Sequence, residues 1–299
     1  MAGSLLLFTL VRTLHGAPFE ASTVANSTVA IDVLHPTRRA EGIGYYGLSN
    51  NIASAIAPAL AIYLLNITHN YNLLFWLAFL TSAIGLGINA TLKLNPRELI
   101  KDKPKISLDR FFLLKGWSEG LSMMCLSFSY GVTATYVAIY GKETLNISGG
   151  SALFFMLLSV GLILSRLVGS RTLRQGKITQ NASVGILISL CGYLMFALLQ
   201  NPIGYYCSAF IVGLGNGHMW PAYQTMFLNL APHTQRGTAN SSILISWDIG
   251  VGLGTLIGGA IAEHCGYQQA FIASALVNLI GIIIFFGYAK NDFLKNKLR

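Results

Sequence analysis

The sequence predicts an all-α protein that crosses a membrane many times, and three observations lead to this fold class. Hydrophobic residues make up 53% of the 299 residues and charged residues only 10%, with a mean hydropathy of +0.57. A soluble domain carries about 25% charged residues, so this chain has too few polar side chains to face water on all sides. Apolar stretches of about 20 residues, long enough for a helix to cross a bilayer, recur along the chain. The basic residues gather in alternate connections between those stretches.

Nine apolar stretches are expected to be transmembrane helices, because each is close to or above the length that crosses about 30 Å of hydrocarbon. A transmembrane barrel would instead show alternating segments of about ten residues, a pattern that this sequence does not follow. The stretches comprise residues 4–34, 43–66, 72–92, 111–140, 151–170, 178–199, 203–231, 238–262 and 267–289.

The distribution of Lys and Arg predicts how these helices are oriented. Seventeen of the 20 basic residues lie after the first, third, fifth and seventh stretches or in the C-terminal tail, whereas the opposite connections hold only Lys142. Cytoplasmic loops of membrane proteins carry an excess of Lys and Arg. We therefore expect a multi-pass protein of a cell membrane, with a bacterial inner membrane preferred, and a cytoplasmic C-terminus. Charged residues on that side are expected to form a gate, comprising Asp32, Arg38, Arg39, Arg166, Arg174, Lys177 and Arg236.

An internal repeat organises the chain. A shift of 197 residues places Arg39 on Arg236, and it places Ala53, Ala57 and Ala61 on Gly250, Gly254 and Gly258. A repeat of apolar helices predicts a transporter built from two related halves. We expect a partial N-terminal bundle of three helices at 1–92, a charged cytoplasmic linker at 93–110 and a six-helix bundle at 111–299. Three helices would then be missing before Met1, although a genuine nine-helix protein remains the alternative.

The net charge of +9 and the four cysteines both have explanations that require no further partner. The basic residues fit cytoplasmic loops better than a nucleic-acid surface. The cysteines Cys125, Cys191, Cys207 and Cys265 have no metal or redox spacing, so they are interpreted as small core residues. We expect no metal and no cofactor, and we expect a lipid bilayer and a small-molecule substrate as partners of a monomer.

Three segments resemble motifs of one transporter family. The segment from Arg12 to Gly16 (RTLHG) is similar to a fourth-helix motif, with His15 in place of Gln. The segment from Ala53 to Ile62 resembles the fifth-helix antiporter motif GxxxGPxxGG, of which it keeps Pro58. The segment 169–177 (GSRTLRQGK) resembles a basic loop motif, with Leu173 where the motif has aspartate.

The family that these segments resemble is the major facilitator superfamily, and in particular its drug and metabolite efflux branch. The resemblance implies two bundles of six helices, of which this chain would hold helices four to twelve. It also implies that the first stretch borders the substrate cavity. The glycines of the antiporter motif stand in the second copy of the repeat, as Gly250, Gly254, Gly258 and Gly259.

Small residues and prolines in these helices also have a direct physical meaning. Small residues every four positions let two helix backbones approach closely. Pro58 and Pro221 interrupt the helical hydrogen bonds and permit a bend. Both features suit helices that rock against each other, and tight packing in a static bundle is the alternative. Gly213, Gly215 and Gly217 follow no strand, so they are interpreted as part of a flexible or broken helix and not as a nucleotide loop.

Charges inside an apolar helix are costly, so they are candidate functional residues. Arg12 and Glu20 lie on one broad face of the first stretch, which His15 and Phe19 border. Arg12 is interpreted as a proton-relay partner, an anchor for an anionic substrate or half of a structural ion pair. Glu20 is either a proton carrier or half of a salt bridge, and His15 is more consistent with packing or a hydrogen bond.

Two further carboxylates and a set of polar side chains complete the candidate substrate and proton pathway. Glu119 and Asp248 could each couple transport to protons, or they could serve gating or structural pairing. Aromatic and amide groups around a cavity suit amphipathic organic substrates, although packing is the commoner role. These candidates are Tyr130, Tyr136, Asn216, His218, Tyr223 and Gln224.

The sequence therefore predicts a secondary active transporter that moves a small organic solute by alternating access, with proton-coupled efflux as the preferred mode. An importer of a sugar or another metabolite has the same architecture, and an inactive fragment is a third possibility. A membrane-embedded enzyme is disfavoured, because the sequence shows no nucleophile–base pair and no metal-ligand spacing.

Overall fold

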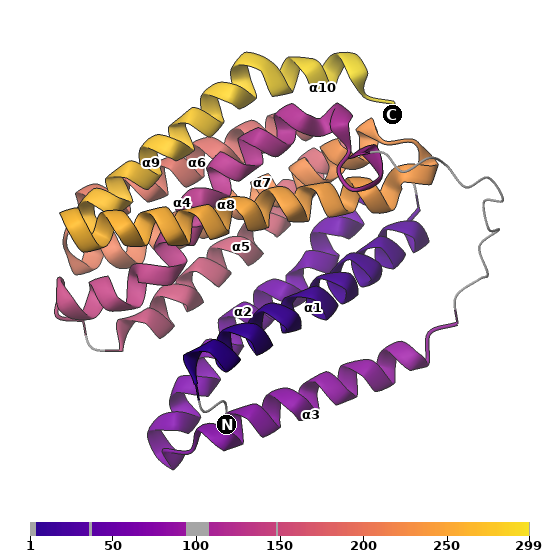
Figure 1. Ribbon diagram of the computed structural model, residues 1–299. Helices are drawn as coiled ribbons and strands as arrows, with labels where there is room; N and C mark the ends of the chain where they lie inside the picture. The colour runs from indigo at the N-terminus through magenta and orange to yellow at the C-terminus, as the bar shows by residue number, and fades with distance from the viewer. Residues whose placement is uncertain (1–3, 36–37, 94–107, 148, 299) are drawn as a thin grey trace.

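The computed structural model describes residues 4–35, 38–93, 108–147 and 149–298, and in these residues the chain forms helices and no strands (Figure 1). An N-terminal group contains α1 (Leu5–Val33), α2 (Arg39–Thr68) and α3 (Tyr71–Ala90). The second group contains α4 (Trp117–Glu143), α5 (Gly150–Arg174), α6 (Ile178–Leu198), α7 (Pro202–Leu230), α8 (Arg236–Cys265), α9 (Tyr267–Ile284) and α10 (Lys290–Asn296). Within this described part, each of the nine predicted stretches overlaps one of the helices α1 to α9.

Local signals in the sequence account for several helix boundaries. The side chains of Ser4, Asn70 and Asn201 accept hydrogen bonds from the first-turn amides of α1, α3 and α7. Pro202 occupies the first turn of α7, where a missing amide costs nothing. The predicted start of the fourth stretch was too early, because residues 111–116 contain a 3₁₀ turn and the Leu113 amide donates to the hydroxyl of Ser242.

The internal repeat is visible in the helix boundaries themselves. Adding 197 to the ends of α1 gives Pro202 and Leu230, which are the ends of α7. The same shift carries the ends of α2 onto Arg236 and Cys265, the ends of α8. These two pairs of equivalent helices therefore begin and end at matching residues, although their side chains differ.

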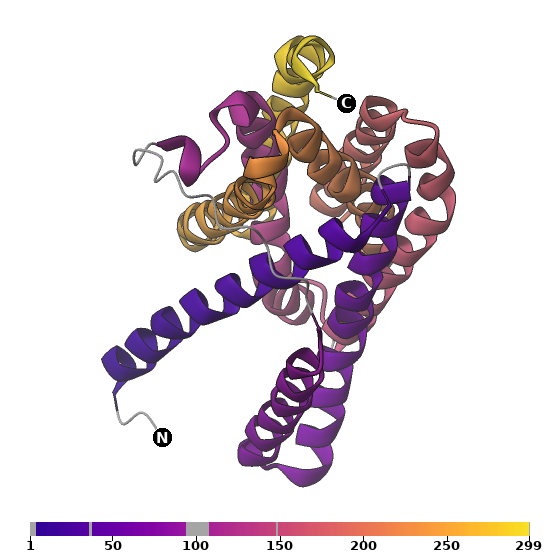
Figure 2. The same ribbon diagram turned by 90° about the vertical axis from the view of Figure 1, so that its right-hand side faces the viewer.

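Among the described residues, the two groups meet mainly at one end of the molecule. Figures 1 and 2 show the N-terminal part of α1 running away from the second group, while its C-terminal part lies against that group. Contacts between the groups run mainly from α2 to α5 and from α1 to α8. We call the joined end the basic end, because Arg38, Arg174, Lys177 and Arg236 begin or end their helices there.

The buried core is also divided between the two ends. The basic-end core includes Ile31 of α1 and Ile43 of α2, which join buried residues of α7 such as Tyr223 and Phe227. The core at the opposite end is rich in aromatic rings and belongs to the second group alone. Its Phe196 and Phe271 rings are 4.6 Å apart in an edge-to-face pair, an arrangement that favours aromatic packing.

Glycines bring α4 and α8 into close backbone contact. A methyl group on Gly250 would overlap the Met124 carbonyl oxygen, and one on Gly254 would overlap the Phe128 carbonyl oxygen. From the opposite side, Gly131 of α4 faces the backbone of Val251. The predicted row of small residues, one at every fourth position, thus packs two helices of one bundle together, as such rows do in membranes.

Six helices in the described part of the chain are long and apolar enough to cross a membrane, namely α3 to α6, α8 and α9 with their adjoining turns. Helices α1 and α7 have 29 residues each, but α1 carries charged residues and α7 contains glycines and polar side chains. The predicted count of nine spans therefore stays a prediction for α1, α2 and α7. Helix α3 buries none of its residues and exposes large apolar side chains all round, as expected of a surface that faces lipid.

Candidate functional site

An ion pair joins the two groups of helices at the basic end. The carboxylate of Asp32, in the last turn of α1, lies 3.4 Å from the Nη1 of Arg236, the first residue of α8. The Arg236 side chain is 12% exposed and that of Asp32 is 24% exposed. A pair this shielded is screened by salt less than a surface pair. The predicted gate residues Asp32 and Arg236 are thus brought together.

A chain of neutral hydrogen bonds reinforces this ion pair. Fully buried Asn240, one turn after Arg236, accepts a bond from the Gln224 amide at 2.8 Å and donates one to the Ser27 hydroxyl at 2.7 Å. The shift of 197 residues carries Ser27 onto Gln224, so Asn240 is bonded to equivalent positions of both groups. Asn240 and Ser27 were not predicted as site residues. A signal existed, since Asn240 is a polar side chain at the position equivalent to buried Ile43.

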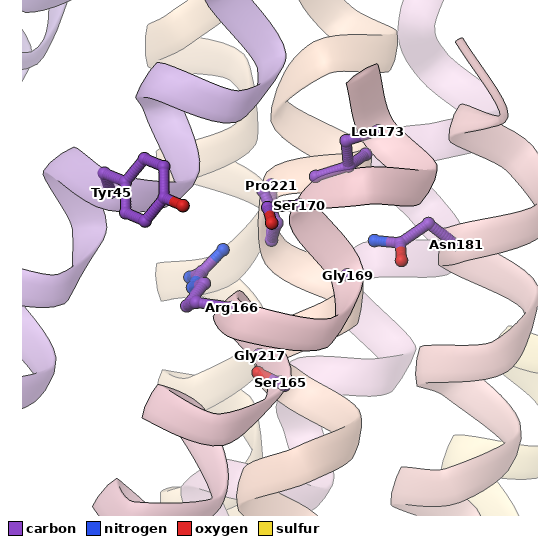
Figure 3. Close-up of a pocket in the computed structure, with 9 residues that line it drawn as sticks. All are labelled: Tyr45, Ser165, Arg166, Gly169, Ser170, Leu173, Asn181, Gly217 and Pro221. Carbon is purple, nitrogen blue, oxygen red and sulfur yellow. The ribbon is translucent and has the colours of Figure 1, made fainter. Parts of the chain in front are cut away.

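The second contact between the groups lies between α2 and α5. Arg166 of α5 is only 5% exposed, and its guanidinium lies beside Gly47 of α2. It lines a cavity of about 10 Å³, which Figure 3 shows with Tyr45 of α2 on one side and Asn181 of α6 on the other. Within the described residues, the Nε and Nη1 atoms of Arg166 have no hydrogen-bond partner. Arg166 therefore behaves as a buried charge at an interface, and its predicted place in a gate stays a prediction.

Three other predicted gate residues lie at helix ends of the basic end. Arg38 is the N-cap residue of α2, Arg174 ends α5, and Lys177 is the N-cap residue of α6. The side chains of Arg39 and Pro58 lie outside the described part of the structure.

Two predicted carboxylates, one from each group of helices, lie within electrostatic range of each other. Glu20, near the middle of α1, is close enough to Asp248 of α8 to act on it electrostatically. Neither residue is buried, since Glu20 is partly exposed and Asp248 is exposed. Two like charges within electrostatic range repel each other, and a proton on either carboxylate would remove the repulsion.

The other candidates on α1 lie apart from this pair. Arg12 is exposed, and within the described residues it forms no salt bridge. The ring of His15 stacks on Phe19 at 6.3 Å, in line with the packing role considered for it. Around Gly16 an added methyl group would meet nothing within 4 Å, so this glycine is not a packing contact here.

Glu119 occupies a different environment, in the first turn of α4. It is fully buried, its Oε2 accepts a hydrogen bond from Ser118 at 2.9 Å, and its Oε1 has no partner among the described residues. It faces the basic-end core and lies in electrostatic range of Tyr223 and Asp292. Glu119 is therefore separate from the pair formed by Glu20 and Asp248.

Aromatic side chains form a cluster beside Asp248. The ring of Trp247 lies 5.2 Å from Tyr130 of α4 and 5.2 Å from Trp220 of α7, and all three rings are partly exposed. Tyr136 belongs elsewhere, because its hydroxyl donates to the Thr255 carbonyl at 2.8 Å and lies against Gly259. The rings of Tyr130, Trp220 and Trp247 form the aromatic cluster.

The polar residues of α7 are mostly engaged inside the second group. His218 Nδ1 lies 2.9 Å from Asn181 Oδ1, the hydroxyl of fully buried Tyr223 lies 2.8 Å from that of Ser122, and Asn216 is 6% exposed. Helix α7 continues unbroken through Pro221, so the broken-helix alternative is not observed, whereas a flexible helix stays a prediction. The Thr225 hydroxyl donates to the Pro221 carbonyl four residues before it. Gly258 packs against Val132 of α4, as expected for a small residue at the contact between α4 and α8.

Comparison with known proteins decides the family. The family model of the Major Facilitator Superfamily matches residues 1–255 and residues 208–297. The chain belongs to the Major Facilitator Superfamily. It is therefore a transport protein and not an enzyme, and no group of three or more His, Cys, Asp or Glu in the described residues could hold a metal ion.

Individual superfamily members show how far the similarity extends. The chain is 21% identical to the staphylopine export protein of Staphylococcus aureus over 270 residues, which are 86% of this chain and 67% of that protein. It is 30% identical to the multidrug resistance protein MdtG of Erwinia billingiae over 98 residues, 33% of this chain and 24% of that protein. The chain thus spans a quarter to two thirds of these relatives.

Solved structures share the fold. The transporter FucP in its outward conformation superposes with a TM-score of 0.63 at 13% identity, over 88% of this chain and 72% of that one. A bacterial homologue of the lysosomal transporter Spinster, in an inward-facing conformation, superposes with a TM-score of 0.55 at 16% identity, over 91% of this chain and 75% of that one. The all-α fold predicted from the sequence is therefore confirmed as a superfamily fold.

Proposed function

We propose that this chain exports an amphipathic organic solute by alternating access, in exchange for protons. The observation that carries the proposal is the one-sided contact between the two groups of helices. They are joined at the basic end by the Asp32–Arg236 ion pair and the Asn240 bonds. At the other end α1 exposes apolar side chains such as Leu6, which is 72% exposed. A pair of bundles joined at one end can rock about a central site.

The basic end is inferred to be cytoplasmic, because basic residues concentrate there. The described conformation would then be open to the outside and closed to the cytoplasm. Nine membrane-spanning helices, in a partial bundle at 1–92 and a complete one at 111–299 with a linker at 93–110, belong to the same proposal.

The aromatic cluster supports an amphipathic substrate. Tyr130, Trp220 and Trp247 offer partly exposed ring faces from three helices of the second group. Large rings next to a few polar groups bind apolar bodies while the polar groups fix their orientation. Export is supported by the names of two relatives, one an export protein and one a multidrug resistance protein.

The pair Glu20 and Asp248 supports coupling to protons. Each carboxylate belongs to a different group of helices, so the repulsion between them opposes any movement that brings the groups closer. A proton on either group removes this repulsion, and its release restores it. Protonation would thereby shift the balance between the two conformations, which is the requirement for coupling.

Transport into inside-out membrane vesicles tests this proposal. In vesicles from cells that produce the chain, a proton gradient, acidic inside, should drive accumulation of fluorescent amphipathic dyes, and a protonophore should abolish it. Asp248→Asn should abolish gradient-driven accumulation while leaving dye binding intact, because the amide cannot exchange a proton. Exposed Glu263, at the far end of α8, provides the control. Accumulation that persists in Asp248→Asn, or that Glu263→Gln abolishes equally, would refute the coupling role.

A further inference from the structure

The buried guanidinium of Arg166 requires a counter-charge that the described side chains do not supply. Arg166 is 5% exposed, and its Nε and Nη1 atoms have no hydrogen-bond partner among them. A charge removed from water is strongly unfavourable unless it is paired and hydrogen-bonded. Gly47 of α2 lies close to it, since a Cβ at that position would lie 3.4 Å from Arg166 Nη2. The unpaired charge therefore sits where α2 passes α5.

The surroundings of Arg166 offer space for one small ligand. The cavity that it lines holds about 10 Å³, which is roughly the space that one water molecule or small ion requires. Figure 3 shows Arg166 together with Ser165 and Ser170 on α5 and with Tyr45 on α2. The hydroxyls of Ser165 and Ser170 donate to carbonyl oxygens of their own helix, so they do not neutralise the guanidinium.

We propose that Arg166 binds a small monovalent inorganic anion of the chloride class in this cavity, and that the anion helps to hold α2 against α5. The charge, the unpartnered nitrogen atoms and the size of the cavity all favour such a ligand. A transported organic solute would not fit a cavity of about 10 Å³. The anion site thus acts on the closed basic end and is independent of the aromatic cluster and of Glu20 and Asp248.

Thermal unfolding of the purified chain in detergent, in sodium chloride against sodium gluconate at equal ionic strength, tests for the site. A ligand that binds only the folded state raises Tm with its concentration. We expect Tm to rise with chloride concentration and to saturate, with no such rise in gluconate. Ser170→Asp should abolish the response, because it places a carboxylate one helical turn from Arg166 and so supplies the counter-charge internally. Ser170→Asn, of the same size but neutral, should keep the response.

Two arginine variants complete the test. Arg166→Gln should lose the chloride response, whereas Arg171→Gln, which changes an exposed arginine of the same helix, should retain it. A Tm that rises equally in chloride and gluconate would overturn the proposal. So would a response that survives in both Ser170→Asp and Arg166→Gln, or one that disappears in Arg171→Gln.

A labelling experiment tests whether the anion joins α2 to α5. Ile43 of α2 is 4% exposed at the basic end, so a cysteine there should react slowly with a maleimide in a chain whose native cysteines are replaced by serine. Chloride should slow this labelling several-fold more than gluconate, and Arg166→Gln should remove the difference. Equal labelling rates in both salts, alongside a chloride-dependent Tm, would retain the site but overturn its role in joining the helices.

Discussion

At the scale of single residues, Asn240 shows how a neutral side chain can join two halves of a transporter. It is fully buried and connects Gln224 of its own group with Ser27 of the other. An amide has both a donor and an acceptor, so one side chain can satisfy two different neighbours. A charge at this position would require a partner of its own, as Asp32 and Arg236 illustrate one turn away.

Asn240→Ala should lower the free energy of unfolding by about 1–3 kcal/mol, because Gln224 and Ser27 would be left with unpaired buried groups. It should also speed maleimide labelling of a cysteine at Ile43, since the basic end would open more often. Tm in detergent and labelling rates measure the two effects. Asn278→Ala provides the control, because Asn278 is equally buried but bonds to the Leu126 carbonyl within the second group. It should lower Tm without speeding the labelling, and equal acceleration by both variants would contradict the role of Asn240.

At the scale of elements, the glycines of α8 fix how closely it packs on α4. The carbonyl oxygens of Met124 and Phe128 occupy the space that side chains at Gly250 and Gly254 would need. Helices packed backbone to backbone have little room to slide, because any lateral shift drives one carbonyl ridge into the other helix. We therefore expect α4 and α8 to move together during transport.

Gly250→Ala should destabilise the chain by about 1–3 kcal/mol, because the added methyl group overlaps the Met124 carbonyl and the Ser127 hydroxyl. Gly252→Ala, two residues further along α8, is the matched control. Nothing lies within 4 Å of a methyl group there, and alanine favours a helix over glycine by roughly 0.5–1 kcal/mol. Tm in detergent should therefore fall for the first variant and stay level or rise for the second. The same loss in both would show that helix propensity, and not packing against α4, explains the glycines.

At the scale of the whole molecule, the chain has a joined basic end and a separated opposite end. A chain without native cysteines should form a disulfide between Ser27→Cys and Asn240→Cys on oxidation, because the native Ser27 Oγ and Asn240 Nδ2 atoms are 2.7 Å apart and the Asp32–Arg236 ion pair still joins the two groups. The pair Leu14→Cys and Leu256→Cys, on the exposed far parts of α1 and α8, should remain reduced. Gel mobility after mild oxidation measures both. Efficient cross-linking of the far pair, with none at the basic end, would mean that the chain rests in the opposite conformation.

Much of this architecture could be predicted from the sequence, since apolar helices and a repeat of 197 residues depend only on patterns along the chain. The boundaries of α1 and α7, and of α2 and α8, agree with that repeat to the residue. Contacts between helices were harder to predict, because they depend on which faces meet. Tyr136 and Tyr223 read as cavity residues from their chemistry, whereas the structure engages their hydroxyls with Thr255 and Ser122. Asn240 was missed because a lone amide in a helix carries no motif.

The matched boundaries of α1 and α7 imply an ancestry by duplication, and the copies have since divided their tasks. Position 32 in the first copy corresponds to Asn229 in the second, and Arg39 corresponds to Arg236. A symmetric ancestor with aspartate at positions 32 and 229 would have had two such ion pairs, one on each side of its pseudo-twofold axis. With asparagine at position 229, the descendant keeps one of them. Releasing the basic end therefore includes breaking the contact between Asp32 and Arg236. A chain with Asn229→Asp would regain the second carboxylate, and a cysteine at Ile43 should then react more slowly with a maleimide.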